Sequence, residues 1–551
     1  MKIALLSNVT VDLLAGMLRK KHEVYLTAGF DTWQQEMMMS GSGLDAFAPD
    51  CVVILLHAGA CQEAWNSVET GCAMMDEWCD TIRNYASGHP GIPVFVSSLD
   101  IASEKCRYGA EKQTDQFFEH YLIEQIGVLY DAGNKVYILP VKDLISEMGR
   151  SVFYSPKMWY VGSMPYSLKG MAALNELMDR YASAAKGTKK KKCLAVDLDN
   201  TLWGGVIGED GVNGIVLSDH NEGARFRDTQ RLLKKMKDQG VMLAILSKNN
   251  PDDVEPVYQH PHMVLQHEDF VAEVINWEPK TVSIRKLASD LNIGLDAFVF
   301  LDDNPAEREQ MKAECPEVTV IEFPKDTSLL PETVAKAYDD WFFSLEVTGE
   351  DTQKTAMYRA ESQRKLERES AGSVEDYLKR LEMTMEIHLM KPEEEARVVQ
   401  LVNKTNQFNV TTRRYSAEEI HRLAEDGDII TVHMSDKYGD QGLTAVMILK
   451  YTNSTAEIDT FLMSCRVMGR KAEEEIMAQV KRYLTGKGIF QVTATYIRTA
   501  KNAPVADLFD RLGFTPAFGK PNGAEKVYRA LTRELPESTG VFKNVNTEGL
   551  A

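Results

Sequence analysis

The sequence predicts a multidomain α/β protein, and three observations support this class. Short apolar runs typical of buried strands alternate with helical stretches over the first two thirds of the chain, a pattern that favours parallel sheets wrapped by helices. The chain has 551 residues, 44% of them hydrophobic, so it can bury several cores. A lysine-rich run at 186–193 separates two such α/β blocks, and we interpret it as a solvated linker.

The first block covers 1–185 and predicts a Rossmann-type α/β domain. Its strand-like runs are "KIALLSN", "CVVILLHAG", "IPVFVSSL" and "KVYILPV". Ser7 and Asn8 stand at the end of the first run, and in this respect the block resembles the SGNH hydrolase fold. It has no Gly-Asp-Ser string, no late Asp-x-x-His, and no histidine between His120 and His220. We therefore expect a docking or substrate-delivery domain without hydrolytic chemistry.

The second block, 190–345, repeats the α/β pattern and carries acids at its strand ends. "CLAVDLD" ends on Asp197 and Asp199, and "AFVFLDD" ends on Asp302 and Asp303. The carboxyl ends of parallel strands share one edge of a sheet, where open α/β folds bind ligands. Clustered carboxylates are costly without a cation, and oxygen-rich sites suit Mg²⁺. The sequence therefore predicts a magnesium site formed by these four acids.

Two further polar positions lie between the acids. Ser247 ends the strand-like run "VMLAILS", and Lys280 stands at a predicted helix start in "NWEPK". The order DxDxT, Ser, Lys, DD resembles the haloacid-dehalogenase (HAD) superfamily of phosphotransferases. That resemblance implies that Asp197 is the nucleophile, that Asp199 is the acid/base and that Lys280 supports the reaction. It assigns phosphate binding to Thr201 and to the segment "LSKNN", with Ser247, Lys248 and Asn249.

The stretch between Thr201 and Ser247 is too short for a folded cap domain. It has room for a flap and one helix. We therefore expect a minimal cap and a site that stays open to a bulky substrate, or to an arm delivered by another protein.

A helical connector, 346–374, leads to a third block with another pattern, 375–535, and then to a predicted flexible tail, 536–551. In "EIDTFLMSCRVMGRKAEEE" a strand runs into Cys465, a basic loop and a helix. Arg466, Gly469 and Arg470 are positioned to bind a phosphate group at that helix N-terminus. Strand, loop and helix resemble the GCN5-related acetyltransferase (GNAT) fold, an α+β fold that binds acyl-CoA in such a loop. Lys471 stands where that fold usually has a second small residue.

Cys465 has two readings. One is a buried structural cysteine. The other is a nucleophile, because a neighbouring arginine and a helix N-terminus favour the thiolate. The segment "NKTNQFN", 403–409, has two readings as well, an acyl-pocket lining or a structural amide network.

The combination of a HAD-like block with a GNAT-like block resembles the FkbH-like family. The resemblance is most specific in "VDLDNTLWGGVIGEDG", "LSKNN", "NWEPK", "LDDNPAERE", "NKTNQFN" and "FLMSCRVMGR". It implies transfer of a glyceryl unit from 1,3-bisphosphoglycerate, through Cys465, to the phosphopantetheine of an acyl carrier protein in polyketide assembly. No D-S-L tripeptide is present, so the carrier is expected in trans. Candidate basic contacts for an acidic carrier are Arg413, Arg414, Arg466, Arg470 and Lys471, which are equally well explained as solvated charges.

Two other functions stay open. One is a phosphohydrolase fused to an acetyltransferase-like domain that acts on another acyl-CoA. The other is a non-catalytic scaffold that recruits a carrier protein, although such a scaffold has no reason to retain clustered acids.

Composition limits the remaining classes. The net charge of −19 and pI near 5.2 argue against a dedicated nucleic-acid binder. The eight cysteines lack metal-ligand spacing, so no zinc site is expected. No stretch approaches the roughly 18 apolar residues that span a bilayer, and the N-terminus lacks a signal-peptide core. We expect a soluble cytoplasmic protein that does not bind membranes.

Overall fold

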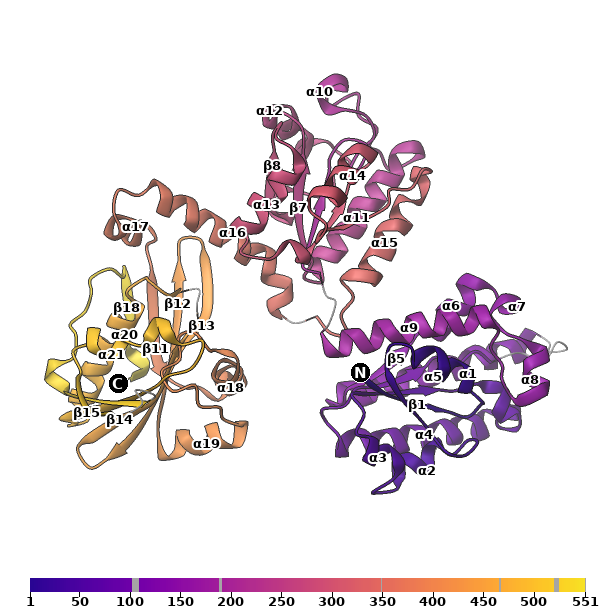
Figure 1. The fold of residues 1–551 in the computed structure, drawn as a ribbon, viewed down its shortest axis with the longest axis horizontal. Coiled ribbons are helices and arrows are strands. Elements are labelled where there is room, and N and C mark those ends of the chain that lie inside the picture. Colours follow the sequence, from indigo (N-terminus) through magenta and orange to yellow (C-terminus); the bar gives the residue numbers. More distant parts are fainter. Residues whose placement is uncertain (102–108, 188–190, 348, 465–466, 520–524, 551) are drawn as a thin grey trace. The chain divides into compact units, whose positions relative to one another are not determined.

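The computed structural model describes residues 1–101, 109–187, 191–347, 349–464, 467–519 and 525–550. The chain divides into two compact units, Met1–Thr355 and Ala356–Ala551. Unit 1 contains two five-stranded parallel sheets and unit 2 one eight-stranded mixed sheet (Figure 1). The predicted multidomain α/β class is confirmed. Among the described residues, no helix is long and apolar enough to cross a membrane.

The first sheet of unit 1 has the strand order β2-β1-β3-β4-β5. Its strands are β1 (Lys2–Ser7), β2 (Glu23–Leu26), β3 (Cys51–Leu55), β4 (Val94–Ser97) and β5 (Val136–Leu139). Helices cover both faces, so side chains of both orientations are buried, and this explains the nearly continuous apolar runs. The helices are α1 (Asp12–Leu18), α2 (Trp33–Met38), α3 (Gly43–Phe47), α4 (Val68–Gly88), α5 (Gly109–Asp131), α6 (Val141–Met148), α7 (Arg150–Phe153), α8 (Pro156–Gly162) and α9 (Leu168–Lys186).

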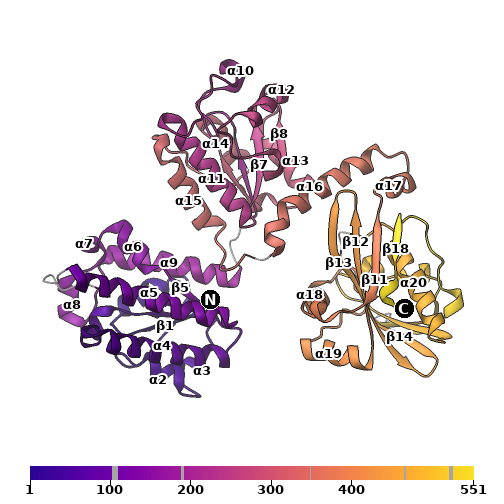
Figure 2. The ribbon, with the colours of Figure 1, turned by 180° about the vertical axis from the view of Figure 1, so that it is seen from behind.

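The second sheet of unit 1 has the order β10-β9-β6-β7-β8. Its strands are β6 (Cys193–Val196), β7 (Met242–Ser247), β8 (Phe270–Ile275), β9 (Phe298–Leu301) and β10 (Thr319–Val320). Its helices are α10 (Ile207–Asp210), α11 (Ala224–Asp238), α12 (Pro251–Val254), α13 (Lys280–Asp290), α14 (Pro305–Glu314) and α15 (Leu330–Trp341). Both views show β7 and β8 between α13 on one side and α11 with α15 on the other (Figure 2).

Unit 2 is built on the order β16-β17-β15-β14-β13-β12-β11-β18. Strands β12 and β13 form an antiparallel hairpin whose turn lies in "KYGDQG". The strands are β11 (Thr384–Leu389), β12 (Gly427–Asp436), β13 (Gly439–Thr452), β14 (Thr455–Met463), β15 (Gln491–Ile497), β16 (Thr515–Gly519), β17 (Glu525–Leu531) and β18 (Asn544–Asn546). The helices are α16 (Gly349–Ser370), which begins in unit 1, α17 (Val374–Arg380), α18 (Glu395–Lys404), α19 (Ala417–Asp426), α20 (Ala472–Gly486) and α21 (Leu508–Arg511).

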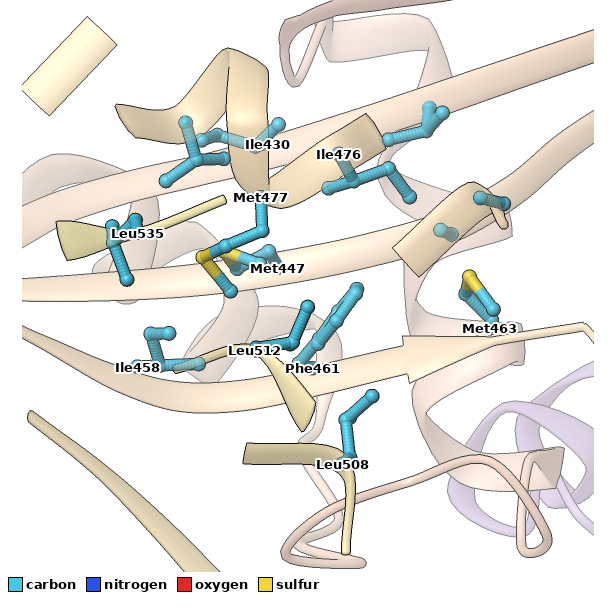
Figure 3. Packing of buried hydrophobic residues seen from close by; sticks show 14 of the residues in the cluster. Ile430, Met447, Ile458, Phe461, Met463, Ile476, Met477, Leu508, Leu512 and Leu535 are labelled. Carbon is cyan, nitrogen blue, oxygen red and sulfur yellow. The ribbon is translucent and has the colours of Figure 1, made fainter. Parts of the chain in front are cut away.

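The core of unit 2 forms where α20 and α21 pack on the sheet. Figure 3 shows Met477 of α20 beside Met447 of β13, with Phe461 of β14 next to Leu512. These side chains are fully buried. The alternation of apolar and polar residues in β15, "QVTATYI", follows from packing one face on this core.

The C-terminal residues, for which the sequence predicts a flexible tail, are packed in the structure. Strand β18 pairs with β11, and Lys543 N donates a hydrogen bond to Met383 O. Buried Glu475 of α20 accepts hydrogen bonds from Ser538 and Thr539. The tail therefore supplies an edge strand, which composition alone does not reveal.

Strands β14 and β15 pair only over Thr455–Ile458 and then separate. Residues 408–410 fill the gap. Met463 N donates to Phe408 O, Val410 N to Phe461 O, and Ile497 N to Val410 O. The segment "NKTNQFN" therefore ends beside the strand that leads towards Cys465.

Candidate functional site

The polar strand ends of the second sheet meet at one edge, as the sequence predicts. Asp197 follows β6, Asp302 follows β9, and Ser247 ends β7. Strand β6 lies between β9 and β7, so these three side chains belong to adjacent strands. Lys280 is the first residue of α13, directly after Pro279.

Lys280 ties two of the acids together inside the protein. Its Nζ lies 2.9 Å from Asp197 Oδ1 and 2.6 Å from Asp302 Oδ2. The exposed fractions are 3% for Lys280, 7% for Asp197 and 0% for Asp302. Burial alone would lower the pKa of Lys280, but attraction to the two carboxylates outweighs burial and raises that pKa. The lysine is therefore held as a cation between them.

The acids outnumber this cation and fit a divalent metal ion. Oxygens of Asp197, Asp302 and Asp303 lie within 4.8 Å of one another. Burial, followed by repulsion from Asp197, raises the pKa of Asp302 to about 6 and also raises the pKa of Asp303. Asp197 Oδ1 is buried and its one partner in the described residues is Lys280 Nζ. Three clustered carboxylates around a single lysine fit Mg²⁺.

Asp199, the fourth predicted ligand, is not in this group of acids. Its Oδ1 accepts hydrogen bonds from Trp203 Nε1 and Ile207 N, both at 3.0 Å. Its Oδ2 accepts one from Asn249 Nδ2, also at 3.0 Å. The carboxylate therefore anchors the loop after β6. Of the three donors to Asp199, the indole of Trp203 is the nearest in sequence, and the sequence pattern did not identify it.

The predicted phosphate-binding residues divide into two groups. Thr201 is fully buried and its hydroxyl has no partner, while the hydroxyl of Ser247 accepts from Asn249 Nδ2 at 3.2 Å. Ser247 ends β7, Asn249 lies in the loop that follows β7, and Thr201 lies in the loop that follows β6. Lys248 instead pairs with Glu307 of α14, at 2.5 Å.

Arg308 is a site-supporting residue that sequence reasoning missed. Its guanidinium donates to the backbone carbonyls of Asp302 and Asp303, at 2.8 and 2.7 Å. It thereby fixes the backbone of the acid pair. The signal available in the sequence was an arginine one turn into the helix that follows "LDDNP".

The segment between Thr201 and Ser247 contains only short α10, a 3₁₀ turn and α11. No folded cap domain lies within it, in agreement with the predicted minimal cap.

The predicted thiol site of unit 2 is only partly covered, because Cys465 and Arg466 lie outside the described residues. Gly469 has φ +74°, a conformation that favours glycine. Arg470 is buried and pairs with Asp436 at 3.1 Å, and Arg364 binds the same carboxylate. The structure thus gives Arg470 an internal partner rather than an open position for phosphate.

Helix α20 begins with three acids, Glu473, Glu474 and Glu475. Burial raises the pKa of Glu473, and the neighbouring Glu474 raises it further. Negative side chains in a first turn already satisfy the helix dipole and repel a phosphate. This helix start is therefore poorly suited to the pyrophosphate of CoA.

The amides of "NKTNQFN" form a structural network. Buried Asn409 accepts from the N–H groups of Thr411 and Thr412. Asn403 donates to the carbonyls of Val399 and Tyr415. These contacts favour the structural reading of that segment.

The predicted basic contacts are also engaged internally. Arg413 pairs with buried Asp459, and Arg414 donates to Val402 O and Asn406 Oδ1. Lys471 lies 3.7 Å from Glu375. These pairings favour the reading of ordinary structural charges.

In the first sheet, Ser7 also has a structural partner. Its hydroxyl donates to Leu55 O at 2.7 Å and accepts from Val9 N. Asn8 exchanges hydrogen bonds with the backbone of His57. Both side chains link the end of β1 to the end of β3.

Comparison with known proteins gives one informative relative. The N-terminal part of the protein BF1531 from Bacteroides fragilis, which contains a phosphatase domain and was solved with Mg, is 27% identical with a TM-score of 0.57. The match covers 63% of this chain and 94% of that chain. No family model matches the sequence, and no curated protein matches it.

Two acetyltransferases are weaker matches. The ribosomal-protein-S18-alanine N-acetyltransferase of Escherichia coli is 13% identical, covers 28% of this chain and 96% of that chain, and has a TM-score of 0.21. The spermidine N-acetyltransferase of Vibrio cholerae is 13% identical, covers 27% and 96%, and has a TM-score of 0.22. These scores are too low to support an argument about unit 2.

Proposed function

We propose that this chain is a Mg²⁺-dependent phosphatase joined to an acyltransferase. The substrate is 1,3-bisphosphoglycerate, and the glyceryl unit of this substrate passes to the phosphopantetheine thiol of an acyl carrier protein. One observation carries the proposal: a buried lysine, three clustered acids and an unpartnered threonine hydroxyl lie at one edge of a parallel sheet. Similarity to a phosphatase domain solved with Mg supports the first half.

In the phosphatase step, a carboxylate oxygen of Asp197 attacks phosphorus while the bond from phosphorus to the leaving oxygen breaks. The leaving oxygen takes up a proton, and water then hydrolyses the aspartyl-phosphate to regenerate Asp197. Asp197, Asp302 and Asp303 would hold Mg²⁺, which would neutralise the phosphoryl charge. Lys280 holds Asp197 in position, and Thr201 offers its free hydroxyl to a phosphoryl oxygen.

Asp199 is assigned as the proton donor and acceptor by the HAD resemblance. Both of its oxygens accept hydrogen bonds from the loop and from Asn249. Oδ2, which accepts only the Asn249 bond, keeps a lone pair free and is the oxygen that carries the proton to the leaving group. The two bonds from Trp203 and Ile207 hold Oδ1 in place.

In the acyl step, the thiolate of Cys465 attacks the carbonyl carbon of the acyl phosphate, and the carbon–oxygen bond to phosphate breaks. The glyceryl thioester then passes to the carrier thiol by thioester exchange, which leaves Cys465 as the thiolate. Because the mixed anhydride is already activated, this route needs no ATP.

The acidic start of α20 and the internal pairing of Arg470 disfavour a pyrophosphate at this helix start, which favours a carrier-borne pantetheine over free CoA. The alternative, an acetyltransferase-like domain that uses another acyl-CoA, lacks such support.

The test is intact-mass spectrometry of the purified protein after incubation with Mg²⁺ and freshly generated 1,3-bisphosphoglycerate. Wild type, Cys465→Ala and the matched control Cys72→Ala are compared, and phosphate release is followed in parallel with Asp197→Asn. We expect a glyceryl adduct on wild type and Cys72→Ala, none on Cys465→Ala, and its discharge onto an added holo-carrier.

Phosphate release that depends on Asp197 but leaves no thiol adduct would refute the transferase half and keep the phosphatase half. Unchanged phosphate release in Asp197→Asn would refute the phosphatase half.

A further inference from the structure

Unit 2 contains a second group of metal-ligand side chains, separate from the acid edge of the second sheet. His388 of β11, Glu394 and His433 of β12 each present a ligand atom, and these atoms lie within 4.8 Å of one another. Glu394 ends a single 3₁₀ turn, Pro392–Glu394, that follows β11. None of these residues has a role in the proposed phosphatase or acyl step.

Strand pairing explains why the two histidines meet. In the antiparallel ladder, Glu386 is opposite His433 and His388 is opposite Thr431. Directly opposed and alternate residues point to one face of a sheet, so these four side chains share a face. The alternate residues of β11, Met385 and Ile387, point to the opposite face and belong to the core beneath α20.

The three ligand atoms converge on one point. Glu394 Oε1 lies 3.0 Å from His388 Nε2 and 2.6 Å from His433 Nε2. The two imidazole rings are stacked, with centroids 5.4 Å apart and an angle of 18° between their planes. In a tetrahedral site with bonds of about 2.1 Å, neighbouring ligand atoms lie about 3.4 Å apart. The distances from Glu394 Oε1 to the two imidazole nitrogens therefore need to lengthen by less than about 1 Å for the three atoms to coordinate one ion.

The surrounding groups orient the ligands. Glu394 Oε2 accepts from Lys391 N and from the Thr431 hydroxyl, both at 3.0 Å, which fixes the carboxylate and leaves Oε1 facing the imidazoles. His388 Nδ1 is buried without a hydrogen bond, and Glu386 Oε1 lies 3.4 Å from it. A carboxylate behind the second ring nitrogen is the usual support of a metal-bound histidine.

We propose that His388, Glu394 and His433 bind one divalent ion of the zinc class. Two imidazoles and one carboxylate suit Zn²⁺ and related transition metals, whereas Mg²⁺ prefers oxygen ligands alone. Three protein ligands leave a fourth position for water or another small ligand. The side chain of His433 is 33% exposed and that of His388 is 5% exposed, so the ion enters from the His433 side.

The cysteine spacings predict no zinc site, and these three ligands include no cysteine. Glu394 and His433 are 39 residues apart, and no local motif connects them. Only the β11–β12 pairing brings the two histidines together.

The experiment is a Zn²⁺ titration of the full chain against a chromophoric chelator, in excess Mg²⁺ so that the carboxylate site of unit 1 is occupied. Co²⁺ replaces Zn²⁺ in a second titration, followed by its visible absorption. The variants are His433→Ala, which removes the partly exposed ligand, and Thr431→Val, which keeps side-chain shape but removes the donor to Glu394. His262→Ala, in the separate histidine pair of His260 and His262, is the matched control.

We expect one tight equivalent in wild type and in His262→Ala. Thr431→Val should weaken Zn²⁺ binding by about 10–100-fold, because loss of a group that orients a metal ligand has an effect of this size. His433→Ala removes a ligand and should weaken binding by at least about 100-fold. Co²⁺ absorption should be lost with His433. If wild type binds no tight equivalent, or His433→Ala retains it, the cluster is a metal-free hydrogen-bond network and the proposal is wrong. The proposed function does not depend on this result.

Discussion

Replacing Lys280 by methionine should destabilise the second sheet of unit 1 in a pH-dependent way. The substitution removes the only cation in the described residues that pairs with both Asp197 and Asp302 and leaves these buried carboxylates facing each other. Loss of one partner from a buried ion pair costs about 3–5 kcal/mol. For the 190–345 block alone, which contains the second sheet, such a loss lowers the melting temperature by roughly 6–20 °C.

The sign of the pH dependence follows from the carboxylates. The pKa of Asp302 is already raised to about 6, by burial and by Asp197, and removal of the lysine raises it further. A carboxylate with a raised folded-state pKa binds its proton more tightly in the folded protein than in the unfolded chain. Stability is therefore lost as pH rises above the unfolded value of about 3.9. The deficit of the variant should be small near pH 4 and complete at pH 8.

Calorimetry of wild type and Lys280→Met at pH 4, 6 and 8, with and without Mg²⁺, measures this effect. Lys312→Met is the matched control, because Lys312 pairs with Glu309 and Glu322 on the surface and its loss should change little. Mg²⁺ should raise the melting temperature of Lys280→Met by more than that of wild type, because the site has gained negative charge. A melting temperature within 2 °C of wild type at pH 8, or a deficit that does not shrink on acidification, would refute the reasoning.

Three further predictions concern packing and charge. Asp459→Asn should cost about 1–3 kcal/mol at pH 7. Burial raises the pKa of Asp459, but Lys450, Tyr415 and Arg413 outweigh burial and lower that pKa. The difference in unfolding free energy from wild type should therefore begin to shrink below about pH 4 and disappear only below the lowered pKa of the folded state. Asn409→Ala removes the acceptor of two backbone N–H groups and should cost about 1–3 kcal/mol in urea unfolding, whereas exposed Asn544→Ala in the same unit should change little. Gly170→Ala places a methyl group 2.3 Å from Phe153 O and should lower the free energy of unfolding by about 1–3 kcal/mol, unlike Gly16→Ala, where the space is open.

Some features of the site could be predicted from the sequence because they are local. A strand buried on both faces must be apolar until it ends. The segments "CLAVD" and "FVFLD" therefore predict both the strand and the acid that follows it. Parallel strands end at one edge, and that rule alone brings Asp197 and Asp302 together. The minimal cap follows from chain length between Thr201 and Ser247.

Other features depend on partners that are remote in the chain. Whether Lys248 contacts a phosphate or Glu307, and whether Arg470 faces solvent or Asp436, depends on which elements pack against them. The orientation of Asp199 towards Trp203 is a matter of loop conformation that no spacing encodes. The packed tail, likewise, became visible only through its pairing with β11.

The sequence by itself determined the α/β class, the strands of the second sheet and the acids at its carboxyl edge, because hydrophobic periodicity and strand ends are properties of contiguous residues. The tertiary structure alone decided which polar side chains are paired, which are left with a free atom, and that His388, Glu394 and His433 meet. A side chain's partner is set by strand register and packing across long sequence separations, and these arise only when the chain folds.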